Sequence, residues 1–329
     1  MDPTDFIGAG GACVLPHWGV LRASGEDSAS FLHGQLTNDV VKLGEREARW
    51  AAFCSAQGRM SASFVVSKRA PDELWLAGPA DVLAPALKRL SMFVLRAKTK
   101  LSDASAELAV VGLAGDAVAP ALVAHDEAAS PALSGDAAAW TQAPLLSGAL
   151  VRLPEAEGRA RWLWIGPAAA VQTLLSALPA LPLALWRWLE VRSGVAPVLA
   201  ATTGQFVPQM LNYELVGGVD FKKGCYPGQE IVARSHYLGK LKRRAFLLDT
   251  AVALEPGQEV YWSGDAQQPA GLVALSAPHP GGGWSALAEL KLGVLESGTL
   301  HLGRPDGPAL TVRPLPYALP GQDAAAPAA

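Results

Sequence analysis

The stretch with the clearest capacity for chemistry is FKKGCYPGQEIVAR, residues 221–234. Two lysines precede Cys225, and a Pro-Gly pair follows it that suits a type II turn, because proline presets φ and glycine accepts positive φ. A helix beginning near Gln229 would place Cys225 just ahead of its N-terminus. A helix N-terminus and nearby ammonium groups both favour the thiolate, although Glu230 opposes them. The local sequence therefore predicts a lowered pKa for Cys225 and a reactive, partly accessible thiol.

Two interpretations of Cys225 are open on these residues alone. In the first, it is a small apolar residue buried beside a turn. In the second, it is a functional thiol that acts as a nucleophile or as a ligand for sulfur or metal. Cys13 and Cys54 lie in apolar surroundings, which favours a structural role for both. Three cysteines without CxxC or Cys/His spacing argue against a disulfide framework and a zinc site, and they favour a reducing, cytoplasmic compartment. The six histidines are scattered singly, so no metal site is predicted.

Composition narrows the class of protein. With 329 residues the chain suits two or three domains, and half of its residues are apolar. A formal net charge of -3 gives no overall attraction to DNA or to a membrane. The longest uncharged stretch, residues 167–186, is interrupted by prolines, and the acidic N-terminal stretch does not resemble a signal peptide. Nucleotide-binding and GxSxG motifs are also absent from the sequence.

The pattern of the first two thirds predicts mixed α+β structure with antiparallel sheets. A strand ends near Ala23, and the helix after it begins with capping-box spacing between Ser24 and Asp27. Two further strands flank a turn at residues 57–58, an amphipathic helix follows, and residues 96–103 alternate like an edge strand. A second round of strands and helices begins near Ala106.

The composition changes after Arg244. Short apolar runs then recur at intervals of about ten residues, separated by Gly, Pro and Asp, which is typical of a small β-barrel or sandwich. We therefore expect one domain over residues 1–240, a C-terminal β-barrel over 241–320 and a flexible tail over 321–329.

The cysteine stretch also resembles a known family. The string KGCYPGQE is similar to the K-G-C-Y-x-G-Q-E signature of the YgfZ family, folate-binding proteins related to the aminomethyltransferase (T-protein) of the glycine cleavage system. The stretches GEDSASFLHGQLTNDV, CSAQGRMSASF, LRAKTKL, EVRSGVAPV and RPLPYAL agree with the family in the same order. The signature residues are Lys223, Gly224, Cys225, Tyr226, Gly228, Gln229 and Glu230.

The resemblance implies an architecture and a ligand. It implies a T-protein-like folate-binding domain of two α+β subdomains with antiparallel sheets, followed by a small C-terminal β-barrel. Residues 46–104 would form much of the second subdomain, and the cysteine loop would face a central cavity. The implied cofactor is tetrahydrofolate or another folate, with Trp18 and Trp186 as its contacts.

Three further polar residues are candidate ligand contacts. Asn38 ends the first helix, where a cap or turn is the alternative role. Arg96 lies in the predicted edge strand together with Lys98, where a solvated surface is an equally good account. Arg234 follows the signature in the predicted helix.

The same resemblance argues against simple enzyme activity. T-protein-like enzymes carry an aspartate after a Gly-Gly pair on the hairpin where this chain has Ala62 and Ser63. Neither side chain takes up a proton near neutral pH, so we expect no aminomethyl transfer by the usual route. A folate-dependent aminomethyl or C1 transferase stays an alternative if Glu230 or Asp39 replaces the missing acid.

The first hypothesis for function is an accessory role. The resemblance implies a folate-binding protein for the assembly or repair of iron-sulfur clusters, with Cys225 as the essential thiol and iron-sulfur enzymes or assembly proteins as partners. Support for tRNA modification would then be indirect. A tRNA-binding module is another alternative, because residues 222–244 contain seven Lys or Arg residues and only one acidic residue. A solvated linker explains the same charges.

Overall fold

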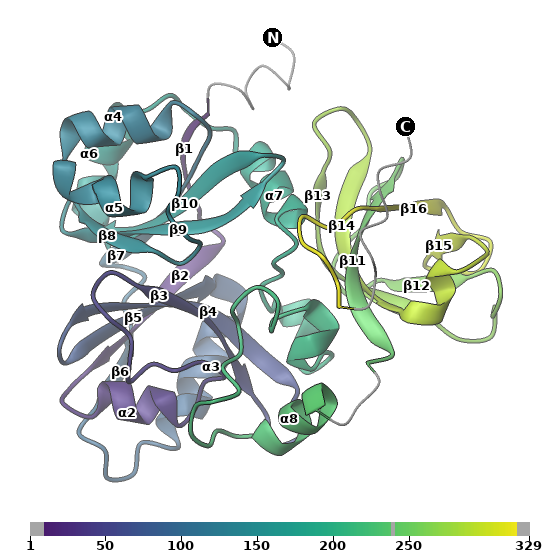
Figure 1. Cartoon of the computed structure of the whole chain (residues 1–329), viewed down its shortest axis with the longest axis horizontal. Helices are drawn as coiled ribbons and strands as arrows, with labels where there is room; N and C mark the ends of the chain where they lie inside the picture. The colour runs from purple at the N-terminus through teal and green to yellow at the C-terminus, as the bar shows by residue number, and fades with distance from the viewer. Residues whose placement is uncertain (1–9, 238–240, 321–329) are drawn as a thin grey trace.

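The computed structural model describes residues 10–237 and 241–320, which form two antiparallel sheets and a closed barrel (Figure 1). The mixed α+β class and the C-terminal barrel predicted from the sequence are confirmed. The three bodies meet around helix α7 (Leu183–Arg192), which lies between the first sheet and the barrel in Figure 1.

Sheet A has five strands in the order β1-β7-β10-β9-β8. Their bounds are β1 (Gly11–Val14), β7 (Leu108–Ala114), β10 (Arg159–Pro167), β9 (Gly148–Ala156) and β8 (Gln142–Leu145). Helices α4 (Val118–His125), α5 (Ser130–Leu133) and α6 (Val171–Ser176), with the 3-10 turns η1 (Glu127–Ala129) and η2 (Ala168–Ala170), accompany this sheet.

Alternation along β10 shows why this sheet has two covered faces. Trp162 and Trp164 point into the core shared with the helices, and their indoles donate to the carbonyls of Ala132 at 2.7 Å and of Leu145 at 2.9 Å. Leu163 and Ile165 point the other way, into the largest core of the molecule. Successive side chains of a strand face opposite sides, so both faces are buried.

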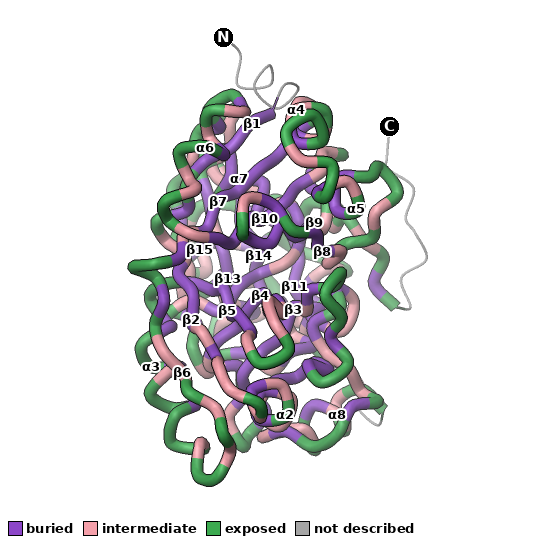
Figure 2. Tube along the Cα trace, turned by 90° about the vertical axis from the view of Figure 1, so that its left-hand side faces the viewer, coloured by how far each residue is buried: buried purple, intermediate pink, exposed green. Residues whose placement is uncertain are grey.

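Sheet B has five strands in the order β3-β4-β5-β2-β6. Their bounds are β3 (Ala48–Cys54), β4 (Met60–Ala70), β5 (Glu73–Pro79), β2 (Trp18–Ser24) and β6 (Lys100–Asp103). Helices α2 (Ser28–His33) and α3 (Ala80–Ser91) share one core with this sheet, and its other face shares the largest core with sheet A. The two sheets therefore share one hydrophobic core, which is part of the buried interior in Figure 2.

The barrel closes in the order β11-β14-β13-β12-β15-β16. Its strands are β11 (Arg243–Thr250), β12 (Glu259–Trp262), β13 (Gly271–Pro278), β14 (Trp284–Lys291), β15 (Leu300–Leu302) and β16 (Ala309–Arg313), with the turn η5 (Leu292–Leu295). The turns η3 (Ala200–Thr202) and η4 (Pro208–Leu211) and helix α8 (Gln229–Tyr237) precede it. We propose that residues 1–240 form the first domain and residues 241–320 the second.

Two local predictions were wrong. The capping box between Ser24 and Asp27 does not form, because Ser24 still belongs to β2, α2 begins only at Ser28, and the Asp27 carboxylate accepts from the Lys98 backbone N–H at 2.7 Å. The predicted edge strand begins at Lys100, so Arg96 and Lys98 lie in the loop before β6. Long-range pairing replaces the local pattern in both cases. The predicted tail at 321–329 and part of the proposed linker, 238–240, lie outside the described residues.

Within the described residues, no helix has the length and apolar character needed to cross a membrane.

Candidate functional site

A small chamber lies between the two sheets beside α7. Its volume is about 40 Å³, and its walls come from β2, β3, β4, β9, β10, α7 and the chain after it. The polar or aromatic lining residues are Trp18, Trp50, Trp140, Arg161, Glu190 and Ser193. Elements distant in sequence therefore bring one acid and one cation to the same buried place.

Glu190 supplies the carboxylate of the chamber. It lies near the end of α7, one turn after Trp186, and is 7% exposed. Its Oε1 accepts from Trp18 Nε1 at 3.2 Å, and its Oε2 lies 3.3 Å from His17 Nε2. Both partners lie at the start of β2, so the carboxylate links α7 to β2. No sequence motif singles out Glu190 as a functional residue.

Arg161 supplies the cation. Its guanidinium lies over the Trp186 ring, 4.6 Å from the centroid, and the residue is 2% exposed. Its Nε has no hydrogen-bond partner, and its Nη1 reaches the Pro154 carbonyl only at 3.5 Å. Burial lowers the pKa of Arg161 to about 10, so the side chain is still protonated at neutral pH.

The two charges of the chamber face each other without touching. Glu190 opposes the effect of burial on the Arg161 pKa, yet no direct ion pair joins these two residues. An unpaired buried polar group costs about 1–3 kcal/mol, so a free N–H of a buried guanidinium calls for an explanation. A molecule with both donors and acceptors that reached these groups would satisfy them, but the chamber as it stands, at about 40 Å³, is too small for a ring system. The unpaired guanidinium N–H and the nearby carboxylate make the chamber a candidate ligand-binding site.

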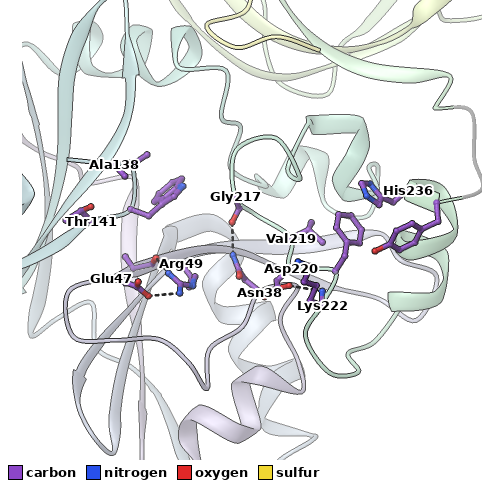
Figure 3. A pocket seen from close by; sticks show the side chains of 15 residues that line it. Asn38, Glu47, Arg49, Ala138, Thr141, Gly217, Val219, Asp220, Lys222 and His236 are labelled. Carbon is purple, nitrogen blue, oxygen red and sulfur yellow. Dashed lines mark hydrogen bonds and ion pairs between the residues drawn. The ribbon is translucent and has the colours of Figure 1, made fainter. Parts of the chain in front are cut away.

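Trp140 stands between the chamber and two larger clefts. The first cleft, about 590 Å³, and the second, about 570 Å³, are both lined by this residue. Its backbone has φ 72°, a left-handed conformation that costs a bulky residue about 1–3 kcal/mol. Its ring stacks on Trp50 with centroids 5.9 Å apart and planes 4° from parallel. Figure 3 shows the first cleft from close by.

The clefts differ in charge. Arg49 and Lys222 bring cationic groups to the first cleft, and Asp220 and Glu47 bring acids, of which Glu47 accepts from Arg49 Nη2 at 2.6 Å. The second cleft carries the acids Glu155 and Glu157. An anionic group is therefore better accommodated in the first cleft.

The cysteine loop has the predicted backbone. Gly228 has φ 79°, and the Gln229 N–H donates to the Tyr226 carbonyl at 3.1 Å, which closes the turn. Helix α8 begins at Gln229, so Cys225 lies ahead of its N-terminus. Cys225 is exposed, whereas Cys13 and Cys54 are buried and burial raises the pKa of each to about 12.

Lys223 anchors this loop from within. Its Nζ donates to the carbonyls of His33 and Leu36, the latter at 2.8 Å, and lies 4.6 Å from the centroid of the Tyr226 ring. Burial lowers the pKa of Lys223 to about 8. Lys223, one of the two lysines expected to favour the thiolate, therefore donates its hydrogen bonds to the chain at the end of α2.

The resemblance implied that the cysteine loop faces a central cavity, and the position of the sulfur itself can be compared with the hollows of the structure. Among the described residues, the lining of the chamber and of both clefts does not include Cys225. Its neighbour Lys222 lines the first cleft, and Pro227 lines a groove of about 750 Å³ between the β3–β4 hairpin and α3. The loop thus separates two hollows and presents the sulfur at the surface.

The two predicted tryptophan contacts have different places. Trp18 lines the chamber and donates to Glu190. Trp186 is fully buried behind Arg161 and does not line the chamber.

The other candidate contacts are separate from the chamber. Asn38 lines the first cleft, but its amide donates to the carbonyls of Trp50 and Gly217 and its Oδ1 accepts from the Asp39 N–H, so the fold uses the whole group (Figure 3). Arg96 and Arg234 are exposed, and neither lines the chamber.

The hairpin positions without an acid are part of the core. Ala62 packs against sheet B's helices, and Ser63 Oγ accepts from the Val198 N–H at 2.9 Å. The two replacement acids considered from sequence do not line the chamber: Asp39 accepts from the Lys42 N–H at 3.0 Å, and Glu230 is exposed.

Three of the seven basic residues over 222–244 make internal contacts, whereas Lys222 and Arg234 are exposed. Arg243 pairs with Glu289 at 2.7 Å, Arg244 pairs with Glu214, and Lys223 is the internal anchor. Over the described part of the chain, no group of three or more His, Cys, Asp or Glu residues is arranged to hold a metal.

Comparisons with known proteins identify the fold and the family. The solved structure of the glycine cleavage system aminomethyltransferase T from Bartonella henselae superposes with a TM-score of 0.73 at 16% identity, covering 96% of this chain and 88% of that one. The chain thus has the aminomethyltransferase fold. No family model matches it.

Curated relatives make the assignment more specific. The tRNA-modifying protein YgfZ of Klebsiella pneumoniae is 30% identical over 317 residues, covering 93% of this chain and 92% of that protein. The protein of the same name from Colwellia psychrerythraea is 32% identical over 239 residues, covering 72% and 70%. The chain belongs to the YgfZ family.

Proposed function

We propose that this protein binds a reduced folate in the chamber and uses the Cys225 thiol to assist the assembly or repair of iron-sulfur proteins. The observation that carries the folate part is the buried Arg161 and Glu190, which face one small chamber without pairing to each other. The effect on tRNA modification is indirect, through an iron-sulfur enzyme that modifies tRNA.

The chamber suits the chemistry of a pterin. A pterin ring presents ring and amino N–H groups that a carboxylate accepts and a carbonyl that a guanidinium donates to. Glu190 and Arg161 would hold these two edges, and Trp18 would pack beside the ring. The anionic glutamate tail would lie in the first cleft, near Arg49 and Lys222. A bound folate supplies a carrier for one-carbon units, and the chain's own residues bind and orient it.

The cysteine loop suits a client that approaches from outside. The thiol is exposed, and the turn and the buried Lys223 anchor fix the backbone on both sides of it. As a thiolate it can coordinate iron, or it can attack a disulfide or the outer sulfur of a persulfide on a client, whose other sulfur then leaves as a thiol. One cysteine cannot hold a cluster alone, so the cluster itself belongs to the partner. The name shared by the relatives, tRNA-modifying protein, fits this indirect role.

Titration with tetrahydrofolate, followed by tryptophan fluorescence, tests the ligand and its site together. We expect the wild type to bind, and Trp18→Phe to bind more weakly because Glu190 loses a hydrogen-bond donor. Trp186→Phe should weaken binding less, because this ring acts only through Arg161. Absence of binding to the wild type would reject the folate proposal.

A transferase is the second candidate, and one observation favours it. Glu190 is an acid within the chamber, which neither Ala62 nor Ser63 provides. Methylene-tetrahydrofolate formed from an aminomethyl donor by the wild type, and lost in Glu190→Gln, would establish this activity. No turnover at high protein concentration would leave the accessory role.

The tRNA-binding module is the third candidate, favoured by the name of the relatives and weakened by the internal pairing of the basic segment. We expect no tRNA binding at low salt. Binding whose affinity falls steeply with salt would establish a direct RNA surface.

A further inference from the structure

We propose that Trp140 is a displaceable plug of the chamber and that the flat ring of a bound folate takes its place against Trp50. This inference rests on the proposed folate function. It concerns a residue that neither the cysteine signature nor the predicted tryptophan contacts include.

The size of the chamber requires that something moves. Its volume of about 40 Å³ is close to that of one water molecule, whereas sites for small molecules usually occupy about 300 Å³ or more. Two clefts of sufficient size lie directly outside it, at about 590 and 570 Å³. A bicyclic ring reaches Glu190 and Arg161 only if the wall between chamber and clefts opens.

Trp140 is the part of that wall with the right position. It lines the chamber and both clefts, whereas Pro154 and Ser193 are shared only by the chamber and the second cleft. The neighbouring residues 138 and 139 are exposed, and the Trp140 side chain itself is half-buried. Removal of this one indole would therefore join three hollows into one site.

The contacts of Trp140 fix its backbone more firmly than its side chain. The backbone N–H donates to the Arg152 carbonyl at 2.7 Å, and the carbonyl accepts from the Ala48 N–H at 2.8 Å, so the main chain bridges β9 and β3. The indole has one hydrogen bond, from Nε1 to the Val216 carbonyl at 2.9 Å, and the stack on Trp50.

An aromatic ligand replaces what the indole loses. A pterin stacked on Trp50 restores that contact and gains Glu190 and Arg161, and the freed indole N–H meets water in a cleft. The left-handed backbone of Trp140 is consistent with this role, because such strain in a non-glycine residue collects at ligand sites and switch regions.

Two measurements on the full chain with tetrahydrofolate test the plug. In protein labelled with nitrogen-15 at tryptophan, with the signal assigned by Trp140→Phe, the Trp140 indole N–H should be protected from hydrogen exchange when free and lose protection when ligand is bound. In stopped-flow mixing, the wild-type rate should level off with ligand concentration because opening limits it. Trp140→Ala should bind about tenfold faster or more, without levelling off. Trp262→Ala, in the barrel, is the matched control and should behave as the wild type.

The outcomes separate the plug from the folate proposal. Tetrahydrofolate binding with an unchanged Trp140 indole N–H, and with equal association rates in wild type and Trp140→Ala, would overturn the plug and leave the folate proposal standing. No binding to any of these proteins would overturn the folate proposal and the plug with it. If Trp140→Ala does not fold, the exchange measurement on the wild type decides alone.

Discussion

The chamber and the cysteine loop both contain a buried cation, and they use it in opposite ways. Lys223 donates to two backbone carbonyls at the end of α2, so its charge is spent on holding the loop. Arg161 is at least as buried, but its Nε has no partner and its nearest acid does not touch it. A buried polar group that has its hydrogen-bond partners holds the chain in position. A buried polar group that lacks them has donors or acceptors left for a ligand.

The same contrast separates the two proposed activities in space. The chamber is internal and is built from both sheets and α7. The thiol is exposed, and among the described residues it lines neither the chamber nor the two clefts. Lys222, three residues before Cys225, lines the first cleft but not the chamber. Changes in one region should therefore leave the other intact.

The largest effect is expected from Cys225→Ala. In cells lacking the protein, this variant should fail to restore the activity of an iron-sulfur enzyme, while its melting temperature and tetrahydrofolate affinity match those of the wild type. Cys54→Ala is the matched control, because it alters a buried cysteine and should lower stability by about 1 kcal/mol with activity retained. Full restoration by Cys225→Ala would reject the role of the thiol.

Lys223→Met tests the anchor of the loop. Two carbonyls lose their donor, which is offset in part by relief of a desolvated ammonium, so we expect the free energy of unfolding to fall by about 1–3 kcal/mol. Urea denaturation measures this. Lys222→Met, at an exposed position, should change it by no more than about 0.5 kcal/mol. Equal effects of the two substitutions would contradict the internal anchor.

A smaller effect is the pH dependence of the difference in free energy of unfolding between the wild type and Lys223→Met. The pKa of Lys223 falls from 10.5 to about 8 on folding, so between these values the unfolded chain binds more protons and stability rises with pH. The free energy of unfolding of the wild type minus that of Lys223→Met should therefore increase as pH rises from about 8 toward 10.5 and be constant below this window. A difference that falls with rising pH would show that the ammonium is favoured by folding.

The parts that sequence predicted well are local. The turn before α8 follows from Pro227 and Gly228, whose backbone preferences depend on no distant contact, and the start of α8 follows from the turn. The barrel was recognisable because each short strand carries its own turn signals. The T-protein-like arrangement rested on the resemblance, which long motifs across the chain supported.

The parts that sequence missed depend on distant contacts. Glu190 looks like an ordinary helix carboxylate, although its place one turn after Trp186 puts it on a buried face. Arg161 stands at an inward position of β10, in register with Leu163 and Ile165, which was the available signal. No residue preference predicts a left-handed Trp140, because the conformation is imposed by pairing between two sheets.

The most direct test of the account is calorimetric titration with tetrahydrofolate of the wild type, Glu190→Gln and Glu155→Gln. Glu155 is a more exposed acid of the second cleft and is the control. Loss of a charge-assisted hydrogen bond in the chamber should weaken Glu190→Gln by roughly tenfold to a hundredfold, while Glu155→Gln binds as the wild type does. Equal affinity of Glu190→Gln and the wild type, or no binding by any of the three, would contradict the chamber as the folate site.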